Sequence, residues 1–244
     1  MNWSEFEDEL ARRRDAGRPV QFWWRDDDAG AVLPPLKQLI ELSRKKQIPL
    51  ALAVVPETAE SELFRLLHDR VTVLQHGTDH RNRASPGEKK TEYPVAETVE
   101  AALARVSDGF GTLRTLAGRR FLPVLAPPWN RVRKDLLTKL PAIGIRGLSG
   151  YGARASVEPA PGLRQVNTHV DIVAWRAGKG FIGEEEALSK AMQHLSGEEP
   201  VGWLTHHAVH DARAWKFLER LFTLRDIRWL SATEAFSYTA AAHG

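Results

Sequence analysis

The chain has 244 residues, 43% hydrophobic and 27% charged, which is typical of a globular protein with one large domain or two small ones. There are no cysteines, so disulfides, thiolate metal sites and a cysteine nucleophile are excluded. The net charge is only +3 and acidic residues are interleaved with basic ones, which argues against nucleic acid as a partner. No stretch reaches the ~20 apolar residues of a membrane span, and the acidic amino terminus lacks a secretory pattern, which predicts a cytoplasmic protein.

Strand-like and helical patterns alternate along the chain, after an amphipathic helix expected over residues 2–16. Strands are expected over residues 20–25, 50–55, 71–75, 121–126, 144–148, 163–168, 201–205 and 227–230. Helices are expected over residues 35–46, 57–67, 94–116, 132–140, 184–195 and 211–222. Because such alternation indicates βαβ units, we predict a single α/β domain, a distorted or incomplete (β/α) barrel of seven to eight parallel strands. An open doubly wound sheet is the alternative.

Three adjacent carboxylates, Asp26, Asp27 and Asp28, end the first predicted strand. The preceding run from Phe22 to Trp24 is typical of a buried strand, because aromatic side chains fit a packed, pleated surface. An ionised carboxylate in a core costs several kcal/mol unless it is paired or binds a metal. Taken alone, the run would indicate an acidic loop after a strand.

Polar side chains also follow several later strands. His76 and His80 follow the third predicted strand, and residues 127–131 follow the fourth. His169 and Asp171 follow the sixth, and His206 and His207 follow the seventh. Catalytic residues of a (β/α) barrel gather at the carboxyl ends of its strands. His76 and His80 are four apart, so in a helical turn they share a face, and with a carboxylate they form a metal site with open coordination positions. We therefore predict a divalent metal centre.

These motifs resemble those of the polysaccharide deacetylase family, also known as the NodB homology domain or carbohydrate esterase family 4. The matching segments, in the family's order, are Arg25-Asp-Asp-Asp28, His76-Gly-Thr-Asp-His80, Ala126-Pro-Pro-Trp129 and Leu204-Thr-His206. The resemblance implies a distorted (β/α) barrel that removes N- or O-acetyl groups from carbohydrates. It also implies a divalent metal, zinc being the common one, with cobalt or nickel as alternatives.

Matched residue by residue, the resemblance assigns Asp27 as the catalytic base and Asp28, His76 and His80 as the metal ligands. It assigns His206 as the general acid that protonates the leaving group. The neighbouring residue His207 competes for that role, since strand alternation would point only one of the two inward. Asp26 is expected to be a bystander, provided that the strand ends before Asp27 and lets the backbone turn.

The family's fourth motif, an aspartate followed by a tryptophan, is matched loosely by Asp171 and Trp175, and Asp171 is expected to orient the acid. Candidate substrate-binding residues are Pro128, Trp129, Arg131 and Trp175, whose apolar surfaces would pack against a sugar or acyl group. Core packing is the competing interpretation of the two tryptophans. His68, His194 and His243 are interpreted as ordinary surface or packing residues.

One departure from the family pattern bears on activity. The third motif usually opens with an arginine that orients the base, whereas this chain has Ala126, so Arg25 or Arg131 is expected to substitute. The missing arginine also supports a second hypothesis, a non-catalytic relative that binds a sugar or metal. A third hypothesis is an iron(II) oxygenase with two histidines and one carboxylate, but such enzymes usually have all-β scaffolds. The expected partner is a carbohydrate or acetylated small molecule, and the sequence does not indicate the oligomeric state.

Overall fold

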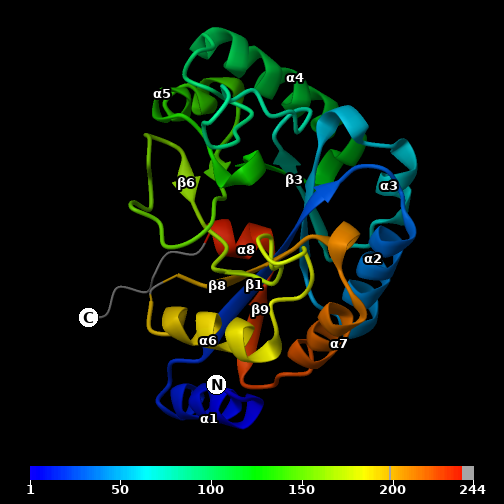
Figure 1. The fold of residues 1–244 in the computed structure, drawn as a ribbon, viewed down its shortest axis with the longest axis vertical. Coiled ribbons are helices and arrows are strands. Elements are labelled where there is room, and N and C mark those ends of the chain that lie inside the picture. The colour runs from blue at the N-terminus through cyan, green and yellow to red at the C-terminus, as the bar shows by residue number, and fades with distance from the viewer. Residues whose placement is uncertain (198, 238–244) are drawn as a thin grey trace.

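The computed structural model describes residues 1–197 and 199–237 and contains one parallel sheet that curls into an incomplete barrel (Figure 1). The strand order is β6-β5-β4-β3-β2-β1-β8-β7, and β9 pairs with the amino-terminal half of β1. Within the described ranges no ladder joins β6 to β7, so the barrel is open there. The strands are β1 (Val20–Ala29), β2 (Leu50–Val54), β3 (Val71–His76), β4 (Phe121–Ala126), β5 (Gly147–Leu148), β6 (Arg164–Gln165), β7 (Val170–Asp171), β8 (Val201–Thr205) and β9 (Ile227–Leu230). The predicted distorted barrel of parallel strands is confirmed.

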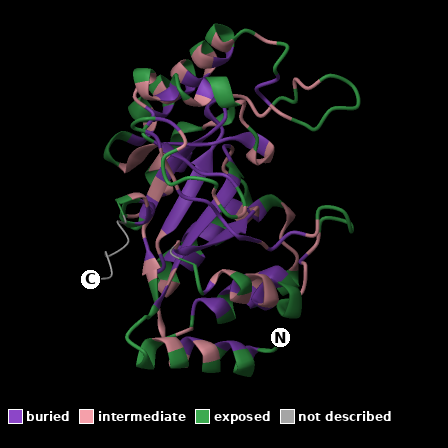
Figure 2. Ribbon diagram, turned by 90° about the vertical axis from the view of Figure 1, so that its left-hand side faces the viewer, coloured by how far each residue is buried: buried purple, intermediate pink, exposed green. Residues whose placement is uncertain are grey.

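Helices surround this sheet, and Figure 2 shows the strands as a buried layer inside helices whose outer faces are exposed. The α-helices are α1 (Trp3–Asp15), α2 (Pro34–Lys46), α3 (Ser61–Leu66), α4 (Val99–Ala117), α5 (Lys134–Leu137), α6 (Glu184–His194), α7 (Ala212–Leu221) and α8 (Ala232–Ser237). Short 3₁₀ turns are η1 (Pro56–Thr58), η2 (Gly118–Arg120), η3 (Pro128–Asn130), η4 (Leu140–Ile143) and η5 (His207–Val209). No helix in the described part of the chain is long and apolar enough to cross a membrane. His243 lies outside the described residues.

Several predicted boundaries are wrong. The helix expected from residue 94 begins at Val99, because the Thr98 side chain caps it by accepting the Ala101 N–H at 3.2 Å. The strands expected over residues 144–148 and 163–168 shrink to the two-residue β5 and β6. Asp171 does not follow the sixth strand but lies in a separate strand, β7, that pairs with β8. Strands of two residues are too short to show an alternating pattern.

Side-chain alternation along β1 sorts its residues between two environments. Phe22 and Trp24 pack in the large cluster beneath the outer helices, whereas Trp23 packs in a separate cluster with α8. By the same alternation Arg25 and Asp27 lie on the Trp23 side of the sheet, inside the barrel, and Asp26 lies on the Trp24 side. The strand therefore delivers neighbouring charged residues to opposite faces of the sheet.

Candidate metal centre and active site

Asp28, His76 and His80 come together at the carboxyl ends of β1 and β3. Each offers one ligand atom, and these atoms lie within 4.8 Å of one another. Asp28 Oδ1 is 3.1 Å from Nε2 of His76 and 3.1 Å from Nε2 of His80. His76 is buried, while Asp28 and His80 are partly open to solvent. Two imidazoles and one carboxylate suit zinc and related divalent metals and leave coordination positions free.

The hydrogen-bond partners of His76 provide a test of whether these residues fit a cation. Nδ1 lies 2.9 Å from the Ala126 carbonyl oxygen and Nε2 lies 3.1 Å from Asp28, so both ring nitrogens face acceptors. A neutral imidazole has one proton and cannot donate to both. Although burial opposes protonation, Asp27 and Asp28 raise the pKa of His76. A metal in place of the second proton would leave Nδ1–H bonded to the carbonyl, the usual arrangement of a histidine ligand. The residues therefore fit a divalent metal.

An irregularity in β1 brings Asp28 to this cluster. In a regular strand Asp28 would share the face of Asp26 and point away from Asp27. Instead Asp28 has φ 67°, and the register between β1 and β2 shifts between Asp26 and Ala29, as in a β-bulge. Asp27 and Asp28 consequently both act on His76, which each of them stabilises in its charged form. The expectation that the strand ends before Asp27 is wrong, because β1 continues to Ala29.

The segment between the two histidines is a tight turn rather than the helical turn that the spacing suggested. Gly77 and His80 have positive φ values of 61° and 55°. The buried Glu92, from the following loop, accepts the backbone N–H groups of Thr78 and Asp79 at 2.8 and 3.2 Å. A Cβ atom at Gly77 would lie 2.0 Å from Glu92 Oε2, so this packing requires glycine. Glu92 thus holds the turn that presents both imidazoles, and sequence reasoning missed it.

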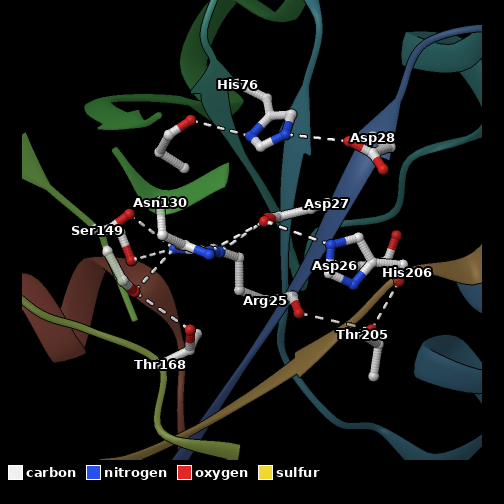
Figure 3. Close-up of polar contacts among 12 residues, drawn as sticks. Arg25, Asp26, Asp27, Asp28, His76, Asn130, Ser149, Thr168, Thr205 and His206 are labelled. Carbon is white, nitrogen blue, oxygen red and sulfur yellow. Dashed lines mark hydrogen bonds and ion pairs between the residues drawn. The ribbon is translucent and has the colours of Figure 1, made fainter. Parts of the chain in front are cut away.

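Asp27 is held by Arg25, which is fully buried. Arg25 Nη2 donates to Asp27 Oδ2 at 2.9 Å, and Nε lies 2.8 Å from Oδ1 (Figure 3). On its other side the guanidinium donates to Ser149 Oγ at 2.7 Å and to Asn130 Oδ1 at 2.9 Å. A buried ion pair needs such additional hydrogen bonds to offset the loss of solvation. Asn130 lies in the segment of residues 127–131 that follows the fourth predicted strand, whereas no motif marks Ser149 in the sequence.

Two arginines were candidates to replace the one missing at position 126. Arg25 contacts both oxygens of Asp27. Arg131 is exposed and donates to the Lys90 carbonyl oxygen at 2.9 Å, on the loop that follows His80. The contact that the family pattern places on the fourth strand is therefore made here from β1, two residues before the carboxylate that it orients.

His206 lies between two carboxylates at the end of β8. Its Nε2 is 3.9 Å from Asp27 Oδ2, and its Nδ1 is 3.8 Å from Asp171 Oδ1. Asp171 accepts the Trp175 Nε1–H at 2.7 Å and the Val173 N–H at 3.0 Å, and burial raises the pKa of Asp171. The Trp175 ring stands edge-on to the His206 ring, with centroids 4.7 Å apart. Asp171 and Trp175, the aspartate and tryptophan of the loosely matched fourth motif, thus both lie against His206.

His207 points away from this site and into the protein. Its Nδ1 lies 2.5 Å from Asp26 Oδ1, and its backbone N–H donates to Asp26 Oδ2 at 3.0 Å. Thr205 Oγ1 donates to the same Oδ2 at 2.6 Å. Asp26 is fully buried, so it is neither part of an exposed acidic loop nor a residue without a partner. Of the two neighbouring histidines, only His206 lies beside Asp27.

The candidate substrate-binding residues divide into two groups. The Trp129 ring lies 4.6 Å from the His80 ring, centroid to centroid, and Pro128 is buried against the Gly77 turn. Trp175 is 45% exposed beside His206, so it is not a core residue. These three flank the metal cluster and His206, whereas Arg131 lies outside them in an adjoining groove.

Comparison with known proteins gives a fold but no close relative. No family model matches the sequence, and no curated protein matches it. A peptidoglycan deacetylase from Bacillus subtilis superposes with a TM-score of 0.57 at 11% identity, covering 88% of this chain and 89% of that one. A family 4 carbohydrate esterase from Streptomyces lividans, in complex with acetate, gives 0.54 at 14% identity and covers 84% and 86%. A family 4 acetyl xylan esterase from Clostridium thermocellum, with a cobalt ion, gives 0.58 at 12% and covers 88% and 90%.

The chain has the polysaccharide deacetylase fold. The resemblance drawn from four short motifs is therefore confirmed at the level of the fold. Identities of 11–14% explain why whole-sequence comparisons find no match while the motif residues still converge in space.

Proposed function

We propose that this protein is a metal-dependent deacetylase, a hydrolase that removes an acyl group, typically N-acetyl, from a carbohydrate or related small molecule. The observation that carries the proposal is the position of Asp27. It lies next to a three-ligand cluster, is oriented by a buried arginine, and faces a histidine 3.9 Å away. The similarity to structures of deacetylases and esterases, one with acetate and one with cobalt, supports the same activity.

The metal would be held by Asp28, His76 and His80, with zinc expected and cobalt or nickel as alternatives. When bound, a divalent cation lowers the pKa of water and polarises a carbonyl group. Asp27 then acts as the general base that accepts a proton from the attacking water. Arg25 keeps both oxygens of Asp27 in place, so the carboxylate needs no reorientation during the proton transfer.

His206 is suited to donate a proton to the leaving amine or alcohol. Its Nε2 faces the site, and its Nδ1 lies 3.8 Å from Asp171 Oδ1. We propose Asp171 as the residue that orients His206. Trp129, Trp175 and Pro128 would form apolar walls around the acyl group and the sugar ring.

The two rival hypotheses fit the structure less well. A non-catalytic relative would not need an arginine that holds both oxygens of Asp27. Arg25 makes this contact, so the absence of an arginine at Ala126 no longer argues against activity. An iron(II) oxygenase would use the three ligands but would leave Arg25, Asp27 and His206 without a role.

The proposal is tested by metal content and acetate release. Purified protein should hold about one divalent metal per chain, and His76→Ala or Asp28→Ala should abolish both metal binding and hydrolysis. Acetate release would be assayed on acetylated monosaccharides, nucleotide-sugars and short oligosaccharides with added zinc, cobalt or nickel. His68→Ala and Asp108→Ala, which lie away from the cluster, are the matched controls.

Two outcomes would contradict the proposal. Equal metal content in wild type, His76→Ala and Asp28→Ala would show that the cluster is not the metal site. Stoichiometric metal without acetate release from any of the substrates would favour the non-catalytic hypothesis.

A further inference from the structure

A groove of about 710 Å³ adjoins the candidate active site. It is lined by residues of the loop 88–96 and of the segment 127–133, together with Leu137, Leu148, Gly150 and Gln165. Its volume falls within the range of typical small-molecule sites, about 300–1,000 Å³. The function proposed above does not use this groove, because the metal ligands, Asp27 and His206 do not line it.

Asn130 connects the groove to the catalytic carboxylate. Asn130 lines the groove, and its Oδ1 accepts a hydrogen bond from Arg25, the residue that holds Asp27. Trp129 and Asn130 both have φ 55°, a left-handed conformation that is costly for side chains larger than glycine. This turn presents Trp129 to the His80 ring and Asn130 to Arg25. A substrate whose acyl group lies beside Asp27 would extend past this turn into the groove.

The charges that line the groove are unequal. Arg133 is neutralised by Asp135, which contacts its Nε at 2.6 Å and its Nη2 at 2.7 Å. Glu88 accepts the Ser85 backbone N–H at 3.1 Å and is the lone acidic residue of the lining.

The other two charged residues of the lining are cations. Lys89 and Arg131 are exposed, and within the described part of the chain neither lies within 4.0 Å of a carboxylate. Arg131 is also anchored to the groove's other wall, because its Nη1 donates to the Lys90 carbonyl oxygen at 2.9 Å. That contact leaves the rest of the guanidinium free to bind an anion in a bidentate manner.

We propose that this groove selects substrates in which the acylated sugar carries an anionic group, a phosphate or a carboxylate, bound by Arg131 and Lys89. The inference rests on the proposed deacetylase function and deepens it by naming a substrate class. Asn130 marks the boundary between the acyl-binding end and the anion-binding end. Neutral acetylated sugars would still reach Asp27 but would lack the contact in the groove.

The experiment compares three probes, diacetylchitobiose as the neutral one, N-acetylglucosamine 1-phosphate, and an N-acetylglucosamine–glucuronate disaccharide. For the metal-loaded wild type, kcat/KM should be about tenfold or more higher for one or both anionic probes, and the preference should weaken as salt rises. Arg131→Gln and Lys89→Gln should lower kcat/KM on the anionic probes, mainly through KM, and by a much larger factor than on the neutral probe. Lys139→Gln, an exposed lysine outside the groove, should match wild type on all three.

The outcomes separate this inference from the proposed function. Equal kcat/KM on neutral and anionic probes, or a preference that survives Arg131→Gln, would overturn the groove proposal while the deacetylase stands. If no probe is hydrolysed, the proposed function fails on these substrates, and calorimetric titration with the two anionic probes decides about the groove. Binding that is lost in Arg131→Gln would support it, and binding no tighter than that of diacetylchitobiose would overturn it.

Discussion

Two aspartate–histidine pairs join β1 to the segment that follows β8, Asp26 and Asp27 being adjacent in β1 and His206 and His207 adjacent just after Thr205. Asp26 and His207 lie 2.5 Å apart and are both buried. Asp27 and His206 lie 3.9 Å apart at the edge of the candidate site. Neighbouring residues of β1 point to opposite faces of the sheet. Asp26 and its histidine therefore lie in the protein interior, whereas Asp27 and its histidine face the mouth of the barrel.

The two pairs differ in whether all their polar atoms have hydrogen-bond partners. Asp26 accepts three hydrogen bonds. Burial acts to raise the pKa of Asp26 and to lower that of His207, but the contact between the two residues outweighs it. The pKa of Asp26 is lowered and that of His207 is raised, as in a permanent ion pair. In the other pair, Nδ1 of His206 is buried and has no hydrogen-bond partner among the residues that the structure describes. We expect the Asp26–His207 pair, whose hydrogen bonds are all made within the protein, to stabilise the fold. The Asp27–His206 pair has hydrogen-bonding capacity left, so we expect it to be the pair that can exchange protons with a substrate.

The largest expected effect is on the open pair. Asp27→Asn removes the proposed proton acceptor without changing the shape of the side chain, so kcat should fall by about 10²–10⁴-fold. Metal content should stay near that of wild type, since Asp28, His76 and His80 are untouched. Stability should also fall, because the fully buried Arg25 loses its charged partner and one of its N–H groups then faces the amide NH2, so kcat is expressed per folded, metal-loaded molecule. An unchanged rate of acetate release would remove Asp27 from the base role.

The same substitution one residue earlier should destabilise the protein but leave turnover largely intact. The two oxygens of Asp26 accept three hydrogen bonds. In Asp26→Asn an NH2 group replaces one of these oxygens, so it would lie against a group that also donates a hydrogen bond. Breaking a buried charged pair costs about 3–5 kcal/mol of the free energy of unfolding. Urea denaturation should show this loss, while kcat per folded, metal-loaded molecule stays within about tenfold of wild type, far less than the loss at Asp27. A stable variant that has lost turnover would show that the division between the two pairs is wrong.

Much of this arrangement could be predicted from the sequence. The apolar run before Asp26, the spacing of His76 and His80, and the placement of polar residues after strands predicted the barrel and the residues that converge in it. Those signals are local, and they depend on periodicities that the sequence displays directly. They placed the two histidines near the carboxylates of Asp26–Asp28, and the family resemblance selected Asp28, which lies in the cluster.

The rest depends on backbone geometry and distant contacts. A regular strand puts Asp26 and Asp28 on one face, and only the bulge at Asp28, with its positive φ, separates them. The sequence did not show that Asp26 is buried in an ion pair, because its partner, His207, is 181 residues away in the sequence. Asp171 was placed after the wrong strand because β7 has two residues, too few to form a pattern.

Glu92 offers a smaller test of the same contrast between support and chemistry. It is a third buried carboxylate, and it holds the turn between His76 and His80 through two backbone N–H groups rather than through an ionisable partner. Glu92→Gln keeps an acceptor for both groups and should bind metal almost as tightly as wild type. Glu92→Ala frees the turn and should weaken metal affinity by about tenfold, the low end of the effect of removing a residue that orients ligands. Competition with a chromophoric chelator measures both affinities. Equal weakening in the two variants would mean that the charge of Glu92, rather than its hydrogen bonds, acts on the metal.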